Sequence, residues 1–278
     1  GLGDVYKRQV RKGLWDSIEA AEADETVKAI VVIGAGRTFP AGADINEFGT
    51  VMREPYLPDV IDRIEECKKP VVAALHGTAL GGGFEVALGS HYRIAPADAR
   101  IGLPEVNLGL LPGAGGTQRM PRLCGAKITL DVMLSGKPIS AAKAYAMGLI
   151  DRLAEGDLRS EAIQFAEEVQ TIRRSREEDK GFLDTKSYHH ALDDAKKMIS
   201  ARMRGQLAPI KIIECVTTAL EKPFTEGRTF ERASFFECLS SEQSKGMIHA
   251  FFAERASAKV PEASRAKPVS YTHLRAHE

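Results

Sequence analysis

Two glutamates, Glu85 and Glu105, stand twenty positions apart, each beside a glycine-rich segment. Glu85 closes the run from Leu80 through three consecutive glycines, and Glu105 is followed by a second glycine-rich run over 112–119. Glycine lets the backbone approach a ligand closely and point N–H groups at it. A carboxyl group beside such a run can move protons on whatever the N–H groups hold. The pattern predicts proton transfer on a small molecule that backbone amides hold in place.

Composition narrows the class of protein. The 278 residues contain 38 Lys and Arg against 38 Asp and Glu, so the formal net charge is zero and no nucleic-acid partner is expected. The longest apolar runs, at 29–33 and 71–75, have the length of strands, so no membrane span is expected. No spacing of His, Cys and carboxylates predicts a metal site. Four scattered cysteines are expected to be reduced and mostly buried, as in a cytoplasmic protein: Cys67, Cys124, Cys215 and Cys238.

Hydrophobic periodicity predicts alternating helices and strands in the first half of the chain, which indicates an α/β arrangement. Expected helices cover 10–23, 60–67 and 84–89, and expected strands cover 27–33, 71–75 and 93–95. Beyond residue 126 the pattern is almost entirely helical, with helices at 128–135, 141–147, 159–172, 187–203, 209–220 and 224–239. The glycine spacing of a dinucleotide-binding turn is incomplete at 34–39.

Four motifs carry a family resemblance. They are Phe39 to Ile45, Gly77 to Glu85, Pro104-Glu105 and Pro112 to Arg119. Together, from about Val10 to about Val169, they resemble the enoyl-CoA hydratase/isomerase (crotonase) superfamily. The resemblance implies an α/β fold, the crotonase (ClpP-like) spiral of ββα units in two roughly perpendicular sheets, followed by a C-terminal helical region.

The resemblance also implies roles for particular residues. The backbone N–H groups of Ala41 and Gly82 would form an oxyanion hole for a thioester carbonyl, which stabilises the enolate of the transition state. Glu85 would orient or deprotonate a water, and Glu105 would deliver a proton to C2. The implied reaction is reversible hydration of a trans-2-enoyl-CoA to a 3-hydroxyacyl-CoA, without a cofactor. Glu105 could also shuttle a proton between C2 and C4, which is Δ3,Δ2-enoyl-CoA isomerisation.

Further substrate-binding residues follow from the same motifs: Ala43, Asp44, Ile45, Gly81, Pro104 and Gly113. For Gly113, binding the water and shaping the entry to a helix are equally good interpretations, and a structural cap is the better one for Asp44. Two histidines, His76 and His91, are expected to be structural. A dedicated isomerase and a non-catalytic acyl-CoA-binding module of the same fold stay open as alternatives. Isomerases of this family often lack the glutamate that matches Glu85, so its presence favours hydration.

The segment 247–255 is similar to the linker helix of multifunctional fatty-acid β-oxidation enzymes, in which an NAD-dependent dehydrogenase domain follows in the same chain. We therefore expect a hydratase fragment of a bacterial cytoplasmic enzyme, with further copies of the same chain in a homo-oligomer among its expected partners. Residues 1–9 and 270–278 are similar to translated sequencing adapters and are interpreted as non-native. The expected division is a core at 10–185 without its first strands, C-terminal helices with the linker helix at 186–258, and the start of a linker at 259–269.

Overall fold

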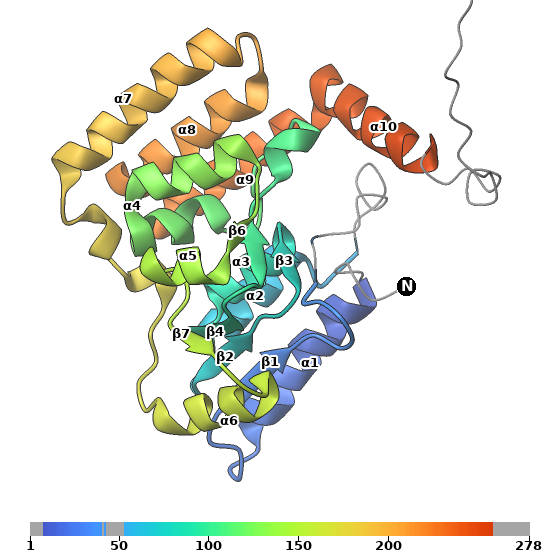
Figure 1. The fold of residues 1–278 in the computed structure, drawn as a ribbon, viewed down its shortest axis with the longest axis vertical. Coiled ribbons are helices and arrows are strands. Elements are labelled where there is room, and N and C mark those ends of the chain that lie inside the picture. The colour runs from blue at the N-terminus through green and yellow to red at the C-terminus, as the bar shows by residue number, and fades with distance from the viewer. Residues whose placement is uncertain (1–7, 41, 43–52, 258–278) are drawn as a thin grey trace, which may run out of the picture.

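The strands form two sheets in the computed structural model, which describes residues 8–40, 42 and 53–257 (Figure 1). The larger sheet is parallel, in the order β1 (Ile30–Ile33), β2 (Val71–Ala74), β4 (Tyr92–Pro96) and β7 (Arg152–Ala154). In the smaller sheet, β5 (Arg100–Gly102) pairs in parallel with β3 (Thr78–Leu80) and antiparallel with β6 (Ile139–Ser140).

The chain passes from one sheet to the other within each repeat. It runs from β2 in the larger sheet to β3 in the smaller one and then enters helix α3 (Gly82–Gly89). The next repeat runs from β4 to β5 and then through the short 3-10 helix η2 (Glu105–Leu108) to α4 (Gly116–Ser135). These are two successive ββα units of the expected kind, and each places a glutamate just after a strand of the smaller sheet.

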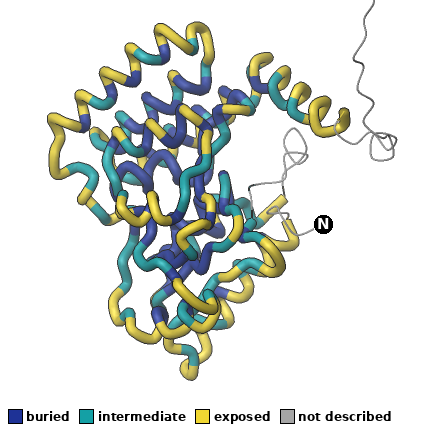
Figure 2. The backbone as a smooth tube through the Cα atoms, in the orientation of Figure 1, coloured by how far each residue is buried: buried dark blue, intermediate teal, exposed yellow. Residues whose placement is uncertain are grey.

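Strand β2 is buried on both faces because helices cover the larger sheet from two sides. Val72 packs with Phe165 of α6 (Leu158–Glu168), whereas Val71 belongs to the main core. That core also contains Ile61 and Phe84, from α2 (Leu57–Glu66) and α3. Helix α1 (Arg8–Ala23) lies outside α2, and the buried interior runs through the centre of the molecule (Figure 2).

The C-terminal half is helical, as expected. It contains α5 (Ala141–Ala146), α7 (Thr185–Arg202), α8 (Leu207–Glu221), α9 (Phe224–Ser240) and α10 (Glu242–Ser257), with two short 3-10 helices, η3 (Ser175–Glu177) and η4 (Lys180–Phe182). Helix α8 packs against α4 and α9, while α10 extends away from the body and contacts α9 and η2 (Figure 1). The segment expected to be a linker helix therefore reaches back to the turn that carries Glu105.

Several expected boundaries were wrong. The strand expected from residue 27 begins at Ile30, and four short strands, β3, β5, β6 and β7, were not predicted because each has only two or three residues. The helix expected at 128–135 is the end of α4, which begins at Gly116 and is interrupted at Gly125 (φ 78°, ψ 173°). Its first turns were not predicted because glycine and proline, here including Pro121, disfavour a helix. The helix expected at 141–147 is α5, and Ser140 caps its start, since the Ser140 side chain accepts from Lys143 N at 3.3 Å.

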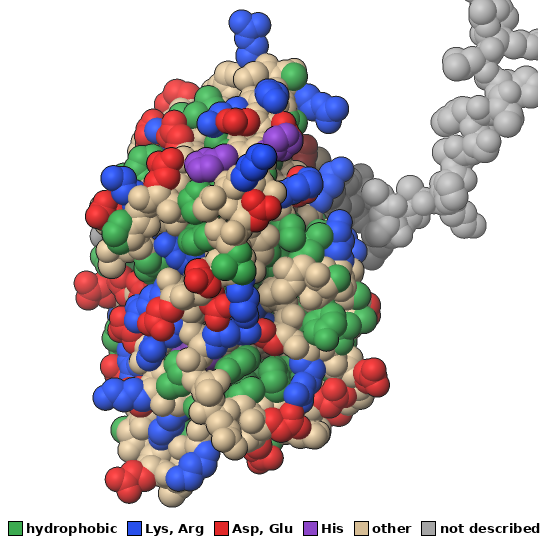
Figure 3. Space-filling view, turned by 90° about the vertical axis from the view of Figure 1, so that its left-hand side faces the viewer, with side chains coloured by type: hydrophobic (Ala, Val, Ile, Leu, Met, Phe, Trp, Pro, Cys, Tyr) green, Lys and Arg blue, Asp and Glu red, His purple; other side chains and the backbone are tan. Residues whose placement is uncertain are grey.

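On the face shown in Figure 3, acidic and basic side chains are interspersed, in keeping with the balanced composition. None of the helices in the described part of the chain is long and apolar enough to cross a bilayer.

Candidate active site

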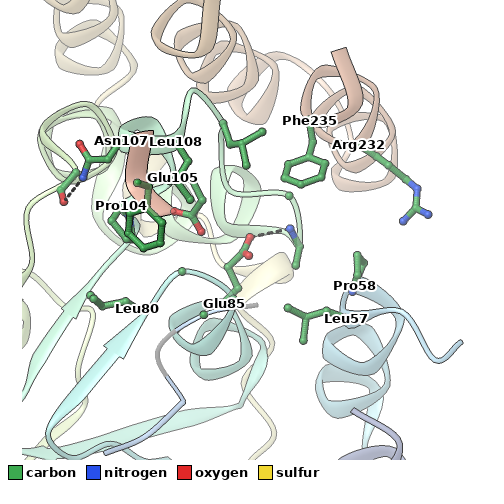
Figure 4. A pocket seen from close by; sticks show the side chains of 18 of the residues that line it. Leu57, Pro58, Leu80, Glu85, Pro104, Glu105, Asn107, Leu108, Arg232 and Phe235 are labelled. Carbon is green, nitrogen blue, oxygen red and sulfur yellow. Dashed lines mark hydrogen bonds between the residues drawn. The ribbon is translucent and has the colours of Figure 1, made fainter. Parts of the chain in front are cut away.

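Both glutamates line one cavity of about 630 Å³. Its walls come from elements far apart in the sequence: the turn before α3, η2, the start of α2, and helices α9 and α10. Figure 4 shows the Glu85 and Glu105 carboxyl groups directed toward the same space from α3 and η2. Leu57 and Pro58 lie across from them on α2, so the carboxyl groups face a largely apolar chamber.

The turn before α3 has a conformation that glycine alone adopts easily. Gly81 has φ 52° and ψ −132°, and a Cβ at this position would lie 2.9 Å from Glu105 Oε1. Gly82 begins α3, and an amide in the first turn of a helix has no carbonyl partner within that helix. The N–H of Gly82 therefore stands at the positive end of the helix dipole, on the wall of the cavity.

The first motif reaches the same cavity through Gly42, which has φ 118° and lines the wall beside Gly81. A Cβ at Gly42 would lie 3.7 Å from Leu80 O, so the two glycine segments are adjacent. Four other predicted site residues lie outside the described residues: Ala41, Ala43, Asp44 and Ile45. Their roles stay predictions.

Glu85 is buried and firmly held. Its Oε1 accepts hydrogen bonds from Ala114 N and Gly116 N, both at 2.8 Å. Burial, and then the negative charge of Glu231, raise the pKa of Glu85 to about 7, with the two amide donors partly opposing both effects. A carboxyl group with this pKa can accept a proton from water and release it again near neutral pH.

Glu105 has a different environment. Its Oε2 is buried and has no hydrogen-bond partner among the described residues. Burial, and then the charge of Glu85, raise the pKa of Glu105 well above its ordinary value. The raised pKa favours the protonated form of Glu105, whose O–H can be donated into the cavity.

The remaining two predicted site residues also line the cavity. Pro104 precedes η2 and fixes its start. Gly113 lies under the Phe235 ring, and a Cβ at Gly113 would come within 2.6 Å of that ring. It precedes α4, as the helix-entry interpretation expects, whereas its proposed contact with a water stays a prediction.

One important buried residue escaped the sequence reasoning. Glu231 of α9 is fully buried, and its carboxylate accepts hydrogen bonds from Gly115 N at 2.8 Å and Thr117 N at 3.1 Å. It lies 116 positions beyond Gly115, in a helix whose pattern shows nothing unusual. To predict the role of Glu231, one would have to know that it lies on the core side of its helix. Helical periodicity alone does not separate such a position from a surface position.

Aromatic and cationic side chains of the C-terminal helices complete the cavity. The Arg232 guanidinium lies 5.5 Å from the Phe236 ring centroid and 5.8 Å from that of Tyr56. On α10, Arg255 lies 5.0 Å from the Phe251 ring centroid. All five side chains line the cavity, so its wall combines rings with two positive groups.

Other candidate residues have structural environments. Both ring nitrogens of buried His91 are bonded, Nδ1 to Val71 N and Nε2 to Glu65 O, which confirms the structural prediction. Only one ring nitrogen of His76 is hydrogen-bonded: Nε2 contacts Gly36 O, whereas Nδ1 has no partner within the described chain. The four cysteines are free, three of them buried and Cys124 partly exposed. No group of three or more His, Cys, Asp or Glu residues in the described part could hold a metal ion.

Comparison with known proteins agrees with this geometry. The enoyl-CoA hydratase/isomerase family matches residues 6–207. The chain is 40% identical over 261 residues to the peroxisomal bifunctional enzyme of Homo sapiens, covering 93% of this chain and 36% of that protein. It is 34% identical to the fatty acid oxidation complex subunit alpha of Shewanella frigidimarina, covering 95% of this chain and 40% of that protein. The chain thus spans little more than a third of the length of these relatives.

The crystal structure of carnitinyl-CoA hydratase from Mycobacterium avium is similar to the whole described fold. It has a TM-score of 0.64 and 29% sequence identity, covering 90% of this chain and 87% of that one. The chain belongs to the enoyl-CoA hydratase/isomerase family. This confirms the predicted family and the predicted α/β crotonase fold with its C-terminal helices.

Proposed function

We propose that this chain catalyses reversible hydration of a trans-2-enoyl-CoA to a 3-hydroxyacyl-CoA in fatty-acid β-oxidation. The observation that carries the proposal is the pair of carboxyl groups facing one largely apolar cavity: Glu85 Oε1 accepts two amide hydrogen bonds, whereas Glu105 Oε2 has no partner among the described residues. The names of the relatives, a peroxisomal bifunctional enzyme and a fatty acid oxidation complex subunit, support the pathway.

The proposed step assigns each carboxyl group one proton transfer. Ionised Glu85 takes a proton from water as the hydroxyl oxygen bonds to C3, and the C2–C3 π electrons move toward the thioester oxygen. The N–H groups of Gly82 and Ala41 stabilise that oxygen, and removing one such donor typically costs about 10²–10³ in rate. Protonated Glu105 then gives its proton to C2. Exchange with solvent returns Glu85 to the carboxylate and Glu105 to the acid.

Isomerisation of a 3-enoyl-CoA is proposed as a side activity. It needs one group that removes a proton from C4 and returns one to C2, and Glu105 has an oxygen without a competing hydrogen bond among the described residues. A dedicated isomerase would need no second carboxyl group, and Glu85 argues against that alternative. Two buried acids with raised pKa values likewise argue against a non-catalytic acyl-CoA-binding module.

The complete protein is proposed to be a multifunctional enzyme with an NAD-dependent 3-hydroxyacyl-CoA dehydrogenase domain in the same chain. The relatives' name "bifunctional enzyme" and the chain's share of their length support this. The domain division given above, a homo-oligomer and a bacterial cytoplasmic location are parts of the same proposal. The relatives include both peroxisomal enzymes and a bacterial one.

The proposal is tested with purified protein and crotonyl-CoA, following the loss of enoyl absorbance. Glu85→Gln and Glu105→Gln preserve size and remove the proton-transfer group, so each is expected to lower kcat by about 10²–10⁴. Glu167→Gln, at an exposed position on α6, is the control and should retain full turnover. Unchanged hydration in either pocket variant would remove that glutamate from the mechanism, and acyl-CoA binding without turnover by the unaltered protein would favour the non-catalytic alternative.

A further inference from the structure

The turn before α4 is shared between two carboxylates. Ala114 N and Gly116 N donate to Glu85 Oε1, whereas Gly115 N donates to Glu231 Oε1 and Thr117 N to Glu231 Oε2. Four consecutive amides thus alternate between a carboxylate on α3 and one on α9. A displacement of the Glu231 side would disturb the peptide groups that hold Glu85, because consecutive peptide planes are joined at a shared Cα.

Glu231 is itself held so tightly that it can act as an anchor. Its Oε1 also accepts from Arg228 NH1 at 2.7 Å, and its Oε2 from Thr117 Oγ1 at 2.6 Å. Each oxygen therefore has two donors, and the side chain is fully buried. Charge-assisted hydrogen bonds of this kind are about twice as strong as neutral ones.

A second contact fixes the same turn against α9. The Phe235 ring, one helical turn beyond Glu231, covers Gly113, where a Cβ would come within 2.6 Å of the ring. On the preceding turn, a Cβ at Gly227 would overlap the Gln118 side chain, whose Nε2 donates to Cys215 O at 2.9 Å. Three residues on successive turns of α9, namely Gly227, Glu231 and Phe235, therefore contact residues 113–118.

We propose that Glu231 is a positioning residue for Glu85: it fixes the turn that holds the Glu85 carboxylate and keeps a second negative charge beside it. This rests on the proposed hydratase function. The charge has a chemical consequence, because it raises the pKa of Glu85 and so makes that group a stronger base toward water. The same charge acts more weakly on Glu105.

Other charged or titratable groups surround this pair and are retained in the test. They are Arg228 on the same helix, Asp62 on α2, Arg119 on α4, Glu105 on η2 and Cys215 on α8. Arg228 binds both Glu231 and Asp62, and Arg119 binds Asp62 and Glu65. The positive groups are thus already paired, and removing the Glu231 charge leaves Arg228 with Asp62.

The decisive variant is Glu231→Gln, which keeps the length of the side chain and one acceptor oxygen. We expect kcat for hydration to fall roughly 10- to 100-fold, because a displaced catalytic group loses rate steeply, with KM changed less than threefold. Isomerisation of a 3-enoyl-CoA, which does not use Glu85 as the water base, should fall less. The acid limb of the hydration pH profile should move to lower pH, since the Glu85 pKa falls with the neighbouring charge removed.

Two further measurements keep the proposal testable if that variant folds poorly. Thr117→Val removes the hydroxyl that donates to Glu231 and accepts from Gln118 Nε2, and it leaves the Glu231 charge, so kcat should fall by a smaller factor while the acid limb stays in place. Asp151→Asn weakens a buried pairing with Arg93 elsewhere, so it should lower the unfolding midpoint without changing kcat. Equal losses of hydration and isomerisation in the Thr117 and Glu231 variants would overturn the proposal.

A readout independent of turnover separates this inference from the proposed function. Carbon-13 NMR of glutamate-labelled protein, with Glu85→Gln to assign the signal, should show Glu85 titrating near pH 7. It should titrate at lower pH in Glu231→Gln. An unmoved Glu85 titration would refute the role of Glu231 even in an active enzyme, whereas a shifted titration in a protein without hydratase activity would refute only the proposed reaction.

Discussion

The two sides of the cavity use the same side chain in opposite settings. On one side, Glu85 Oε1 accepts two amide hydrogen bonds, which favour the ionised form. On the other side, Glu105 Oε2 is buried with no partner in the described chain, which favours the protonated form. The difference shows how two identical carboxyl groups acquire the distinct roles of base and acid from their surroundings alone.

The side chains that hold the Glu85 and Glu105 segments in place differ as well. The turn that holds Glu85 is anchored by the charged side chain of Glu231 on α9. The helix η2 that carries Glu105 is anchored by a neutral contact, in which Ser244 Oγ of α10 donates to Leu108 O at 2.9 Å. Gly109 ends η2 with φ 66°, and a Cβ there would lie 3.0 Å from Ser244 Cα. The Glu231 support therefore adds a charge as well as hydrogen bonds on the Glu85 side, whereas the Ser244 support of η2 adds no charge.

The division of roles between Glu85 and Glu105 predicts that hydration and isomerisation respond differently to each substitution. Glu105→Gln should lower both reactions by about 10²–10⁴, because hydration needs the proton that Glu105 delivers to C2 and isomerisation needs Glu105 to carry a proton from C4 to C2. Glu85→Gln should lower hydration by a similar factor. It should leave isomerisation of a 3-enoyl-CoA within about tenfold of the original rate, since that reaction adds no water. Coupled assays of the two substrates measure the ratio, and equal losses in both variants would show that the two acids are not divided in this way.

The glycines that touch each acid should differ in importance. Gly81→Ala places a side chain in a positive-φ conformation and 2.9 Å from Glu105 Oε1, so we expect a loss of about 1–3 kcal/mol in the free energy of unfolding and a lower kcat. Gly116→Ala crowds Glu85 Oε1 at 3.0 Å without a positive φ and should cost less stability. Urea unfolding measures both.

The control for these two is Gly13→Ala, in the exposed middle of α1, where an added Cβ would meet no other atom of the described residues within 4 Å. It should stabilise the protein by up to about 1 kcal/mol because alanine favours the helix. If Gly81→Ala were as mild as this control, the turn before α3 would not require glycine.

The pH dependence of kcat/KM sharpens the assignment of base and acid. Hydration requires ionised Glu85, whose pKa is about 7, so activity should fall about tenfold per unit as the pH drops below that value. It also requires protonated Glu105, so activity should fall again at a higher pH, above its raised pKa. Stopped-flow rates over a pH series that extends below 4.5 and well above 7 would measure both limbs, and an acid limb at the ordinary glutamate value of 4.5 would contradict the burial argument.

The smallest expected effect concerns the neutral support. Ser244→Ala removes one hydrogen bond to η2, so we expect a loss of about 0.5–1.5 kcal/mol in the free energy of unfolding and a few-fold lower kcat. Because no charge is removed, the acid limb should stay where it is, in contrast to Glu231→Gln. A shift of that limb in the serine variant would mean that geometry, rather than charge, sets the pKa of Glu85.

The sequence by itself determined the local parts of this protein. Apolar runs of strand length predicted the strands around β1, β2 and β4, and helical periodicity predicted most of the C-terminal helices. The glycines beside Glu85 and Glu105 fixed turns that only glycine fits, which is why the two acids could be singled out before any contact was known.

Only the tertiary structure decided which distant side chains support those turns. Glu231 and Ser244 lie on α9 and α10, and nothing in their local sequence distinguishes them from surface residues. Their importance comes from burial and from partners over a hundred positions away, such as Gly115 and Leu108. Short-range patterns encode backbone conformation, whereas the pKa of a buried acid depends on charges and donors that the folded chain alone brings together.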